Sequence, residues 1–476
     1  MMLINHTANY APKRTEVIQN TEKVLYSYMK EILIFGAGRS SRVLISNLHG
    51  QSIHFNWKIK VVDIQFDEVD RLDGVVYSVV NVQDETERDR EVQNSDLVIS
   101  MLPARFHHLV AQSCVKYSRN LLTASYETPE LKAFEEEVNQ KGLFFLNECG
   151  LDPGLDHMSA MKLIDQIKDA GHEMYCFESF TGGLVAPESD NNPWNYKFSW
   201  NPRNVVLAGQ GGPAKFIQNG KIKYIPYHRL FRRTELIDLG EFGMFEGYAN
   251  RDSLKYLGKY SLQGIPTIYR GTLRRPGFSR AWNVFVQLGA TDDSYYIEDT
   301  EKMTYRDFIN SFLPYHPTDS VELKLYHYMN ILQDSEIIYK LKWLGIFSDT
   351  PIGLKRATPA QVLEKILKEK WQLKAGDKDM IVMWHKFEYR DSNTKTKRFK
   401  TSSLVVTGEN SKQTAMALTV GLPLAVAAKL VLNGKLHLKG MYIPNIREIY
   451  DPILAELEKH GIVFHEKEEV AETFTH

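Results

Sequence analysis

The chain has 476 residues, of which 43% are apolar and 25% charged, and its formal net charge is −1. This length is typical of two or three domains, and the composition is that of a globular protein with sizeable cores. The near-neutral charge argues against a nucleic-acid partner. The three cysteines lack metal-ligand spacing and their odd number argues against a disulfide framework, so we expect a reducing, cytoplasmic setting.

Two segments need to be separated from targeting and membrane sequences. Residues 1–28 carry scattered charges instead of the short apolar core of a secretory signal. We interpret them as a poorly ordered extension, or as a segment upstream of a start at Met29. The apolar stretch 415–432 contains Gly421, Pro423 and Lys429, which interrupt the apolar run that a membrane span requires. It is therefore predicted to be a buried helix, and we expect no membrane partner.

The first domain, residues 29–150, begins with a dinucleotide-binding pattern. Residues 32–35 form a short apolar run that ends in Gly36-Ala37-Gly38-Arg39-Ser40-Ser41, and an amphipathic stretch comes next. Gly36 permits a sharp turn, and Gly38 lets the backbone approach a pyrophosphate at a helix N-terminus. Such a glycine motif is weak when it stands alone, so the prediction depends on the strands and helices after it.

The segments after the glycine turn alternate between strand and helix patterns. The strand at 59–62 ends in Asp63, at the spacing of the acidic residue that accepts hydrogen bonds from the adenosine ribose. A carboxylate there would repel a 2′-phosphate, so we favour NAD, with NADP as the alternative; Asp63 could also simply begin a solvated loop. Further strands are predicted at 96–100, 121–124 and 143–146. The alternation predicts an α/β class fold, a Rossmann-type doubly wound parallel sheet.

Beyond residue 150 the pattern is mixed. Four segments have strand character: 174–180, 282–288, 381–384 and 403–406. They predict a second, mixed α/β substrate domain over residues 151–300 and 376–439. Helical patterns predict a small helical subdomain over 301–375. We expect residues 440–476 to return to the first domain and complete it.

Five motifs from residue 150 onward identify a family: Gly150-Leu151-Asp152-Pro153-Gly154-Leu155-Asp156-His157, Gly182-Gly183-Leu184-Val185-Ala186-Pro187-Glu188, Tyr196-Lys197-Phe198-Ser199-Trp200, Tyr248-Ala249-Asn250-Arg251-Asp252 and Arg270-Gly271-Thr272-Leu273-Arg274. In this order the chain resembles saccharopine dehydrogenases (saccharopine reductases) of the glutamate-forming kind. The resemblance runs from about Met29 to the C-terminus. It implies that saccharopine, NAD(P)⁺ and water give glutamate and aminoadipate semialdehyde, without a metal.

The substrate that this resemblance implies has three carboxylates and an amine. Arginine suits carboxylates because its planar fork donates two parallel hydrogen bonds, and we select Arg251 and Arg274. The alternative for Arg251 is a pair with Asp252 at a turn. By resemblance, the substrate site contains Arg251, Ser199 and the backbone of Gly271, Thr272 and Leu273.

The remaining candidates are polar groups near the predicted sheet edge. Ser125 and Tyr126 follow a strand and could bind a substrate carboxylate or amine. Asp152 could hold the protonated amine or assist its deprotonation; otherwise it helps to cap the helix that we expect to begin near Asp156. His157 could act as a base or brace the loop. Asp152 and His157 are thus the two candidates for the catalytic base.

The cofactor should contact the glycine turn and the ends of the strands after it: Gly36, Ala37, Gly38, Arg39, Ser40, Asp63, Asn81, Val82, Leu102, Pro103, Thr123 and Leu151. We expect a small-molecule substrate, and a homodimer is the candidate assembly for this class. Two other functions stay open. One is a carboxynorspermidine dehydrogenase of the same superfamily, and the other is a nucleotide-binding sensor that has lost turnover.

Overall fold

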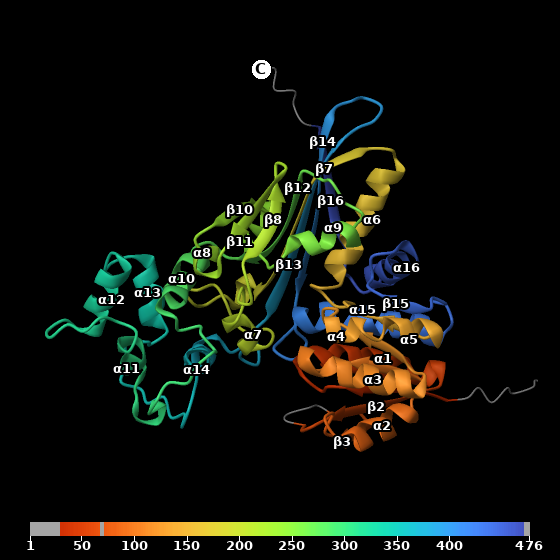
Figure 1. Cartoon of the computed structure of the whole chain (residues 1–476), viewed down its shortest axis with the longest axis horizontal. Coiled ribbons are helices and arrows are strands. Elements are labelled where there is room, and N and C mark those ends of the chain that lie inside the picture. The colour runs from red at the N-terminus through yellow and green to blue at the C-terminus, as the bar shows by residue number, and fades with distance from the viewer. Residues whose placement is uncertain (1–28, 67–70, 471–476) are drawn as a thin grey trace, which may run out of the picture.

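The computed structural model describes residues 29–66 and 71–470, so the two interpretations of residues 1–28 concern a segment outside the described residues. Three layers of structure lie across the molecule in Figure 1. A parallel sheet with its helices lies at the lower right, a second and longer sheet lies in the centre, and a group of helices lies at the left.

The first sheet has seven parallel strands in the order β15-β6-β5-β4-β1-β2-β3. Its strands are β1 (Lys30–Phe35), β2 (Trp57–Asp63), β3 (Val75–Val79), β4 (Leu97–Ser100), β5 (Asn120–Thr123), β6 (Phe144–Leu146) and β15 (Gly440–Tyr442). The helices between them are α1 (Arg42–Phe55), α2 (Glu85–Gln93), α3 (His107–Tyr117), α4 (Pro129–Lys132) and α5 (Glu135–Gln140). This confirms the predicted Rossmann-type sheet.

The strands of this sheet differ in how readily they can be predicted from the sequence. All four residues of β4 are buried, as expected where helices cover both faces. The edge strand β3 is largely exposed, and β15 has only three residues. Neither was predicted, because an exposed edge strand and a very short strand lack a continuous apolar run.

The apolar segment α15 (Ala415–Leu432) is one helix of 18 residues. The helix continues through Gly421, Pro423 and Lys429. By length and composition it could cross a membrane, but 78% of it is buried in this fold. A Cβ on Gly421 would lie 2.7 Å from the backbone nitrogen of Leu44 in α1, so the glycine allows α1 and α15 to pack closely. The predicted buried helix is confirmed.

The second sheet follows the order β10-β11-β12-β7-β13-β14-β16, and β8 and β9 join it beside β12. Its strands are β7 (Glu173–Val185), β8 (Ala214–Gln218), β9 (Lys221–Ile225), β10 (Thr234–Asp238), β11 (Met244–Ala249), β12 (Thr267–Arg274), β13 (Asp379–Arg390), β14 (Lys397–Thr407) and β16 (His465–Val470). Only β7 and β12 pair in parallel. β15 joins the first sheet beside β6, whereas β16 forms the edge of the second sheet beside β14.

The strand predicted at 282–288 is wrong, because this segment belongs to the helix α10 (Phe278–Leu288). Phe278, Trp282 and Phe285 are buried and recur at helical spacing. The segment 282–288 alone is too short to show this spacing. Beside α10 lie the helices at the left of Figure 1: α11 (Tyr305–Asn310), α12 (Val321–Met329), α13 (Glu336–Trp343) and α14 (Pro359–Trp371). Their apolar faces form one core with the lower part of the second sheet.

Candidate active site

The glycine turn after β1 has the shape that a dinucleotide requires. Gly36 has φ +105°, and a Cβ there would lie 2.8 Å from the carbonyl oxygen of Met101, so only glycine fits. A Cβ on Gly38 would meet nothing within 4 Å. Open space therefore lies beside the backbone of Gly38, where a pyrophosphate would sit. Arg39 and Ser40 form the short 3₁₀ turn that leads into α1.

The carboxylate of Asp63 lies against this turn. Its Oδ2 accepts a hydrogen bond from the backbone N–H of Ala37 at 2.7 Å, and its Oδ1 accepts one from Ile64 at 2.7 Å. The acid at the end of β2 is therefore fixed beside the glycine turn. A negative charge is held where the adenosine ribose of a dinucleotide would lie.

The other predicted cofactor residues follow parallel strands of the first sheet. Asn81 and Val82 follow β3, Leu102 and Pro103 follow β4, and Thr123 ends β5. The carboxyl ends of parallel strands meet at one edge, so the structure brings this set to the rim that carries the glycine turn. Their cofactor roles stay predictions.

Leu151 lies beyond the last of these strands. It is 5% exposed and packs in the core that the first sheet shares with α6 (Leu155–Asp169). Its backbone carbonyl accepts a hydrogen bond from the N–H of Asp156. Leu151 therefore helps to place the start of α6, and its cofactor role stays a prediction.

Asp152 lies in a buried group of charges between the first sheet and β12. The guanidinium of Arg270 donates from Nη2 to Oδ1 of Asp152 at 2.9 Å and to Oδ2 of Asp156 at 2.5 Å. The hydroxyl of Tyr126 donates to the same Oδ1 of Asp152 at 3.1 Å. The other oxygen of Asp152, Oδ2, has no hydrogen bond to the described residues, and the side chain is 15% exposed. Asp152 is thus held on one side and open on the other.

Asp156 does not cap α6 as expected. The N-cap is Gly154, and Asp156 lies within the first turn. Its Oδ1 accepts a hydrogen bond from the N–H of Gly154 at 2.6 Å, while its Oδ2 faces Arg270. Asp156 therefore links the start of α6 to the second sheet.

A second set of contacts surrounds His157. Its Nε2 donates to Glu148 at 2.8 Å, and its Nδ1 lies 2.5 Å from the hydroxyl of Tyr260. The other oxygen of Glu148 accepts a hydrogen bond from Lys259 at 3.0 Å. His157 is fully buried and both ring nitrogens are engaged, which favours the bracing role over that of a base. We call these eight residues the Asp152 cluster: Tyr126, Glu148, Asp152, Asp156, His157, Lys259, Tyr260 and Arg270.

The surroundings shift the pKa values of two acids in this cluster in opposite directions. Burial raises the pKa of Asp152, the negative charge of Asp156 raises it further, and Arg270 opposes them. Burial also acts to raise the pKa of Glu148, but the hydrogen bond and charge of His157 and the charge of Lys259 lower it to about 2. Such a separation is typical of one acid that exchanges protons beside another that stays ionised. Asp152 is therefore the better candidate for the base.

Ser125 and Arg251 lie next to the cluster. The hydroxyl of Ser125 is 2.7 Å from Nε2 of His107, whose Nδ1 is 2.8 Å from the hydroxyl of Ser100. Burial, helped by the charge of His108, lowers the pKa of His107 to about 4, so the ring is neutral near pH 7. The exposed guanidinium of Arg251 lies 5.3 Å from the ring of Tyr126.

The alternative role for Arg251, a pair with Asp252, is not found. Asp252 caps a short turn and pairs with Lys215 at 3.3 Å. Arg251 has no carboxylate partner among residues 29–66 and 71–470. A free cation therefore stands beside Tyr126, as a substrate carboxylate would require.

The motif on β12 divides between the two faces of the second sheet. Alternation puts Arg270, Thr272 and Arg274 on one face, and Gly271 and Leu273 on the other. A Cβ on Gly271 would lie 2.2 Å from the ring of Phe180, so this glycine makes room for a core side chain. Leu273 is fully buried in that core. Only backbone atoms of these two residues are left for a substrate, as the resemblance implied.

The predicted Ser199 lies near Gly183 of β7, where a Cβ would be 3.4 Å from its Oγ. The neighbouring Lys197 is buried and donates to Asp377 at 2.7 Å. Lys197 is therefore already neutralised within the protein.

Sequence reasoning missed several members of the site. Arg270 stood in a quoted motif but was not selected, although alternation along β12 places it on the face of Arg274. Glu148, Lys259, Tyr260 and His107 lie outside the five motifs, and Lys259 and Tyr260 are 111 and 103 residues from their partners Glu148 and His157. No local signal could have identified these four.

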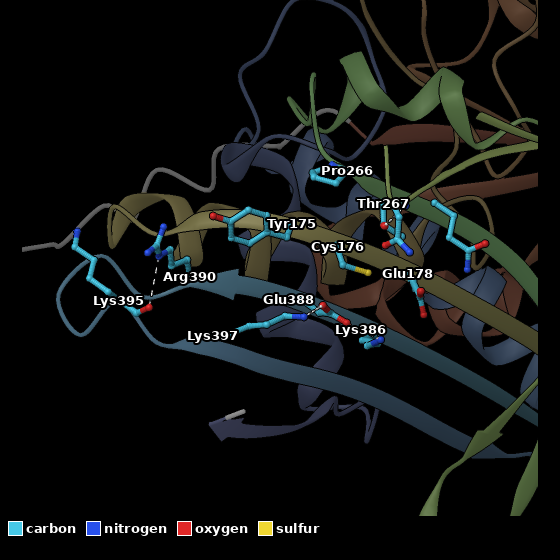
Figure 2. Close-up of a pocket in the computed structure, with 12 residues that line it drawn as sticks. Tyr175, Cys176, Glu178, Pro266, Thr267, Lys386, Glu388, Arg390, Lys395 and Lys397 are labelled. Carbon is cyan, nitrogen blue, oxygen red and sulfur yellow. Dashed lines mark hydrogen bonds and ion pairs between the residues drawn. The ribbon is translucent and has the colours of Figure 1, made fainter. Parts of the chain in front are cut away.

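A separate pocket of about 540 Å³ lies on the opposite face of the second sheet (Figure 2). Glu388 pairs there with Lys386 at 2.8 Å and with Lys397 at 2.7 Å, and Cys176 and Glu178 of β7 line its floor. None of the predicted site residues lines this pocket. Within the described ranges, no group of three or more His, Cys, Asp or Glu residues could hold a metal ion.

The glycine turn, the fixed Asp63 and the Asp152 cluster at one sheet edge define a Rossmann-type dinucleotide-binding protein with a second domain beside the cofactor edge. Two family models match the chain. Residues 32–146 match the saccharopine dehydrogenase NADP binding domain, and residues 150–462 match the saccharopine dehydrogenase C-terminal domain. The chain belongs to the saccharopine dehydrogenase family.

Relatives of this family align over most of the chain. The saccharopine dehydrogenase [NADP(+), L-glutamate-forming] of Pyricularia oryzae is 33% identical over 92% of this chain and 99% of its own length. The mitochondrial alpha-aminoadipic semialdehyde synthase of Rattus norvegicus is 34% identical over 97% of this chain, but the chain spans only 50% of that protein. The solved structure of the L-Glu-forming saccharopine dehydrogenase of Saccharomyces cerevisiae covers 92% of the chain with a TM-score of 0.82 and 31% identity.

Proposed function

We propose that this protein oxidises saccharopine to glutamate and aminoadipate semialdehyde with a nicotinamide dinucleotide, reversibly, in lysine metabolism. The observation that carries the proposal is Asp152, a carboxylate with a raised pKa and one free oxygen at the cofactor edge of a Rossmann sheet. The names of the fungal relatives, aligned over most of their length, support the same reaction.

Asp152 is suited to both proton transfers of this reaction. A nicotinamide cofactor bound at the glycine turn would supply the acceptor for the hydride that leaves the carbon attached to the substrate amine. Asp152 Oδ2 receives the proton of that amine, while Tyr126 and Arg270 hold Oδ1 in place. After that proton is released, Oδ2 accepts a proton from the water that attacks the resulting imine carbon. Asp152 then returns this proton to the nitrogen, the carbon–nitrogen bond breaks, and the nitrogen leaves in glutamate while the remaining hydroxyl loses its proton to give the aldehyde.

The groups around Asp152 fit the charges of the substrate. Ser125 and the free guanidinium of Arg251 lie next to Tyr126, where they would bind the carboxylates nearest to the amine. His157 and Glu148 do not reach the substrate in this proposal. They hold the start of α6, and with it Asp152, in position.

We further propose that NAD is preferred over NADP. Asp63 holds a negative charge at the end of β2, where a 2′-phosphate would be repelled. The matching family model and the fungal relatives carry NADP in their names, so this preference would set the present chain apart from those relatives.

Steady-state assays with saccharopine and each cofactor test both proposals. We expect saccharopine-dependent formation of reduced nicotinamide, with a higher kcat/KM for NAD⁺ than for NADP⁺. Turnover of carboxynorspermidine without turnover of saccharopine would favour the related dehydrogenase. Cofactor binding without turnover of either substrate would favour the sensor, against which the intact glycine turn and the Asp152 cluster argue.

A cytoplasmic location and a homodimer are proposed on weaker grounds. The location is proposed from the cysteine count, and the homodimer from the assembly that is common in this class of enzyme. Cell fractionation and size-exclusion chromatography with light scattering would test them.

A further inference from the structure

Arg274 is a buried cation that makes no ion pair in the described part of the chain. Its cross-strand neighbour Glu246 accepts hydrogen bonds from the backbone N–H groups of Gly277 and Ser279 instead. Arg274 is 3% exposed, its Nη1 donates to the carbonyl of Leu273 at 2.8 Å, and its Nε has no partner there. The rings of Tyr196, Phe278 and Tyr248 lie 5.0, 5.4 and 5.9 Å from the guanidinium carbon. A buried arginine is usually paired with a carboxylate, because the protein otherwise bears the cost of its desolvation. The missing ion pair points to a carboxylate that arrives with a ligand.

Two further polar groups near Arg274 are buried and unpaired. The hydroxyls of Thr181 and Ser199 have no hydrogen-bond partner among the described residues, and these two residues are 6% and 2% exposed. Thr181 of β7 pairs in register with Thr272 of β12, so the two side chains lie on the face that carries Arg274. Ser199 lies over that same face, next to Gly183.

The three unsatisfied groups are therefore gathered over the same face of neighbouring strands. Unpaired buried donors are rare in native proteins because each costs free energy. Two unpaired hydroxyls beside the unpaired Nε of one guanidinium form a built site for an anion with several acceptor atoms.

The spacing along β12 suits one particular part of the proposed substrate. Arg270, which holds Asp152, and Arg274 are separated by roughly 13 Å along an extended strand. Thr272, between them on the same face, is partly exposed. In saccharopine, the carboxylate of the lysine-derived end is separated from the amine by a longer methylene chain than either carboxylate of the glutamate end. It is the carboxylate that can extend furthest from Asp152.

We propose that Arg274, Ser199 and Thr181 bind the carboxylate of the lysine-derived end of saccharopine. The distance from Asp152 to Arg274 then selects substrates by length. This inference rests on the proposed function and adds which substrate end lies along β12. It also accounts for why Arg274 makes no ion pair among the described residues.

The test compares saccharopine with N-(5-aminopentyl)glutamate, which lacks only that carboxylate. We expect the wild-type kcat/KM to be about 100-fold higher for saccharopine. Arg274→Met should lower kcat/KM for saccharopine by a similar factor and change it less than about 3-fold for the analogue. Ser199→Ala should act in the same direction, with a loss of about 5-fold to 10-fold, because it removes one neutral donor.

The outcomes separate this inference from the reaction itself. If Arg274→Met loses equal activity on both substrates, Arg274 acts through packing on its aromatic neighbours, and the inference is overturned. A wild-type enzyme that oxidises neither substrate overturns the proposed function and this inference with it. If the thermal midpoint shows that Arg274→Met does not fold, Ser199→Ala and Thr181→Val decide: an unchanged KM for saccharopine in both variants would refute the subsite.

Discussion

The rim of the first sheet and the Asp152 cluster meet in one site but are held together by different interactions. At the rim, Gly36 and Ala37 are adjacent in sequence, and the carboxylate of Asp63 contacts the backbone N–H of Ala37 from the end of the next strand along the chain. In the cluster, charged side chains from distant segments neutralise one another: Arg270 is 118 residues from Asp152. The rim therefore depends on the path of the backbone, whereas the cluster depends on the balance of charge.

This difference decides what a substitution does in each region. A buried ion pair contributes little net stability, but removal of one partner leaves an uncompensated charge and is costly. A change at the rim is instead tolerated unless a new atom meets the backbone or fills the space for the cofactor. We therefore expect the largest effects in the Asp152 cluster.

The largest expected effect is that of Asp152→Asn. The amide keeps the size of the side chain but cannot accept a proton, so kcat should fall by about 1,000-fold, within the range typical of general bases. The pH profile is the matching signature. Because burial raises the pKa of Asp152, the wild-type kcat/KM should rise with pH through a pKa above that of an ordinary aspartate.

That rise should be absent in the Asp152→Asn variant, whose residual activity should be nearly independent of pH over the same range. Stopped-flow and steady-state kinetics over a pH series would measure both quantities. Full activity with an unchanged pH profile would show that the base is another group. Equal thermal midpoints of the two proteins would exclude unfolding as the cause.

The second prediction concerns Glu148, which the cluster keeps ionised. A carboxyl whose pKa falls from 4.5 to about 2 on folding stabilises the protein above pH 4.5, and this stabilisation is lost as the pH falls from 4.5 to 2. Glu148→Gln should lower the free energy of unfolding by about 3 kcal/mol near pH 7. Its stability should also depend less on pH between 4.5 and 2. Urea unfolding across this range would measure both. A Glu148→Gln variant as stable as the wild type at pH 7 would contradict a stabilising pair between Glu148 and His157.

The sequence was sufficient where structure is local. The glycine turn, the acid at the end of β2 and the alternation of strands and helices each show within a short window, and the first sheet was predicted from them. A short window can also mislead. The helix 278–288 was predicted as a strand, because the window 282–288 is too short to show the helical spacing of its apolar residues. The motifs from residue 150 onward identified a family, and the charges of the substrate that it implies led to Asp152 and Arg274, without showing what either contacts.

The contacts of the cluster could not be predicted, because nothing local encodes them. Tyr260 lies 103 residues from His157, and Lys259 lies 111 residues from Glu148. They meet only once the second sheet is placed against α6. His157 illustrates the consequence: its position suggested a base, but Glu148 and the distant Tyr260 occupy its two nitrogens.

The third prediction compares two glycines of the rim. In Gly36→Ala the new methyl group would meet the carbonyl of Met101 at a positive φ, so the free energy of unfolding should fall by about 2 kcal/mol. In Gly38→Ala the methyl group enters open space, so stability should not change. Gly38→Ala should instead raise KM for the cofactor by about 10-fold, because the methyl group occupies the space through which the pyrophosphate approaches the backbone. Thermal unfolding and cofactor titration would distinguish the two variants. Equal changes in stability and in cofactor KM for both variants would contradict the different roles given to Gly36 and Gly38.

The smallest expected effect is that of Asp63, where backbone contact and charge can be separated. Asp63→Asn keeps an oxygen that can accept from Ala37 but removes the negative charge, whereas Asp63→Ser shortens the side chain and removes the charge as well. If repulsion of a 2′-phosphate sets the cofactor preference, both variants should narrow the ratio of kcat/KM for NAD⁺ and NADP⁺ by about 10-fold. If the hydrogen bond to Ala37 matters more, only Asp63→Ser should weaken binding, and it should do so for both cofactors. A wild-type protein that already prefers NADP⁺ would show that the carboxylate of Asp63 serves the turn and not the choice of cofactor.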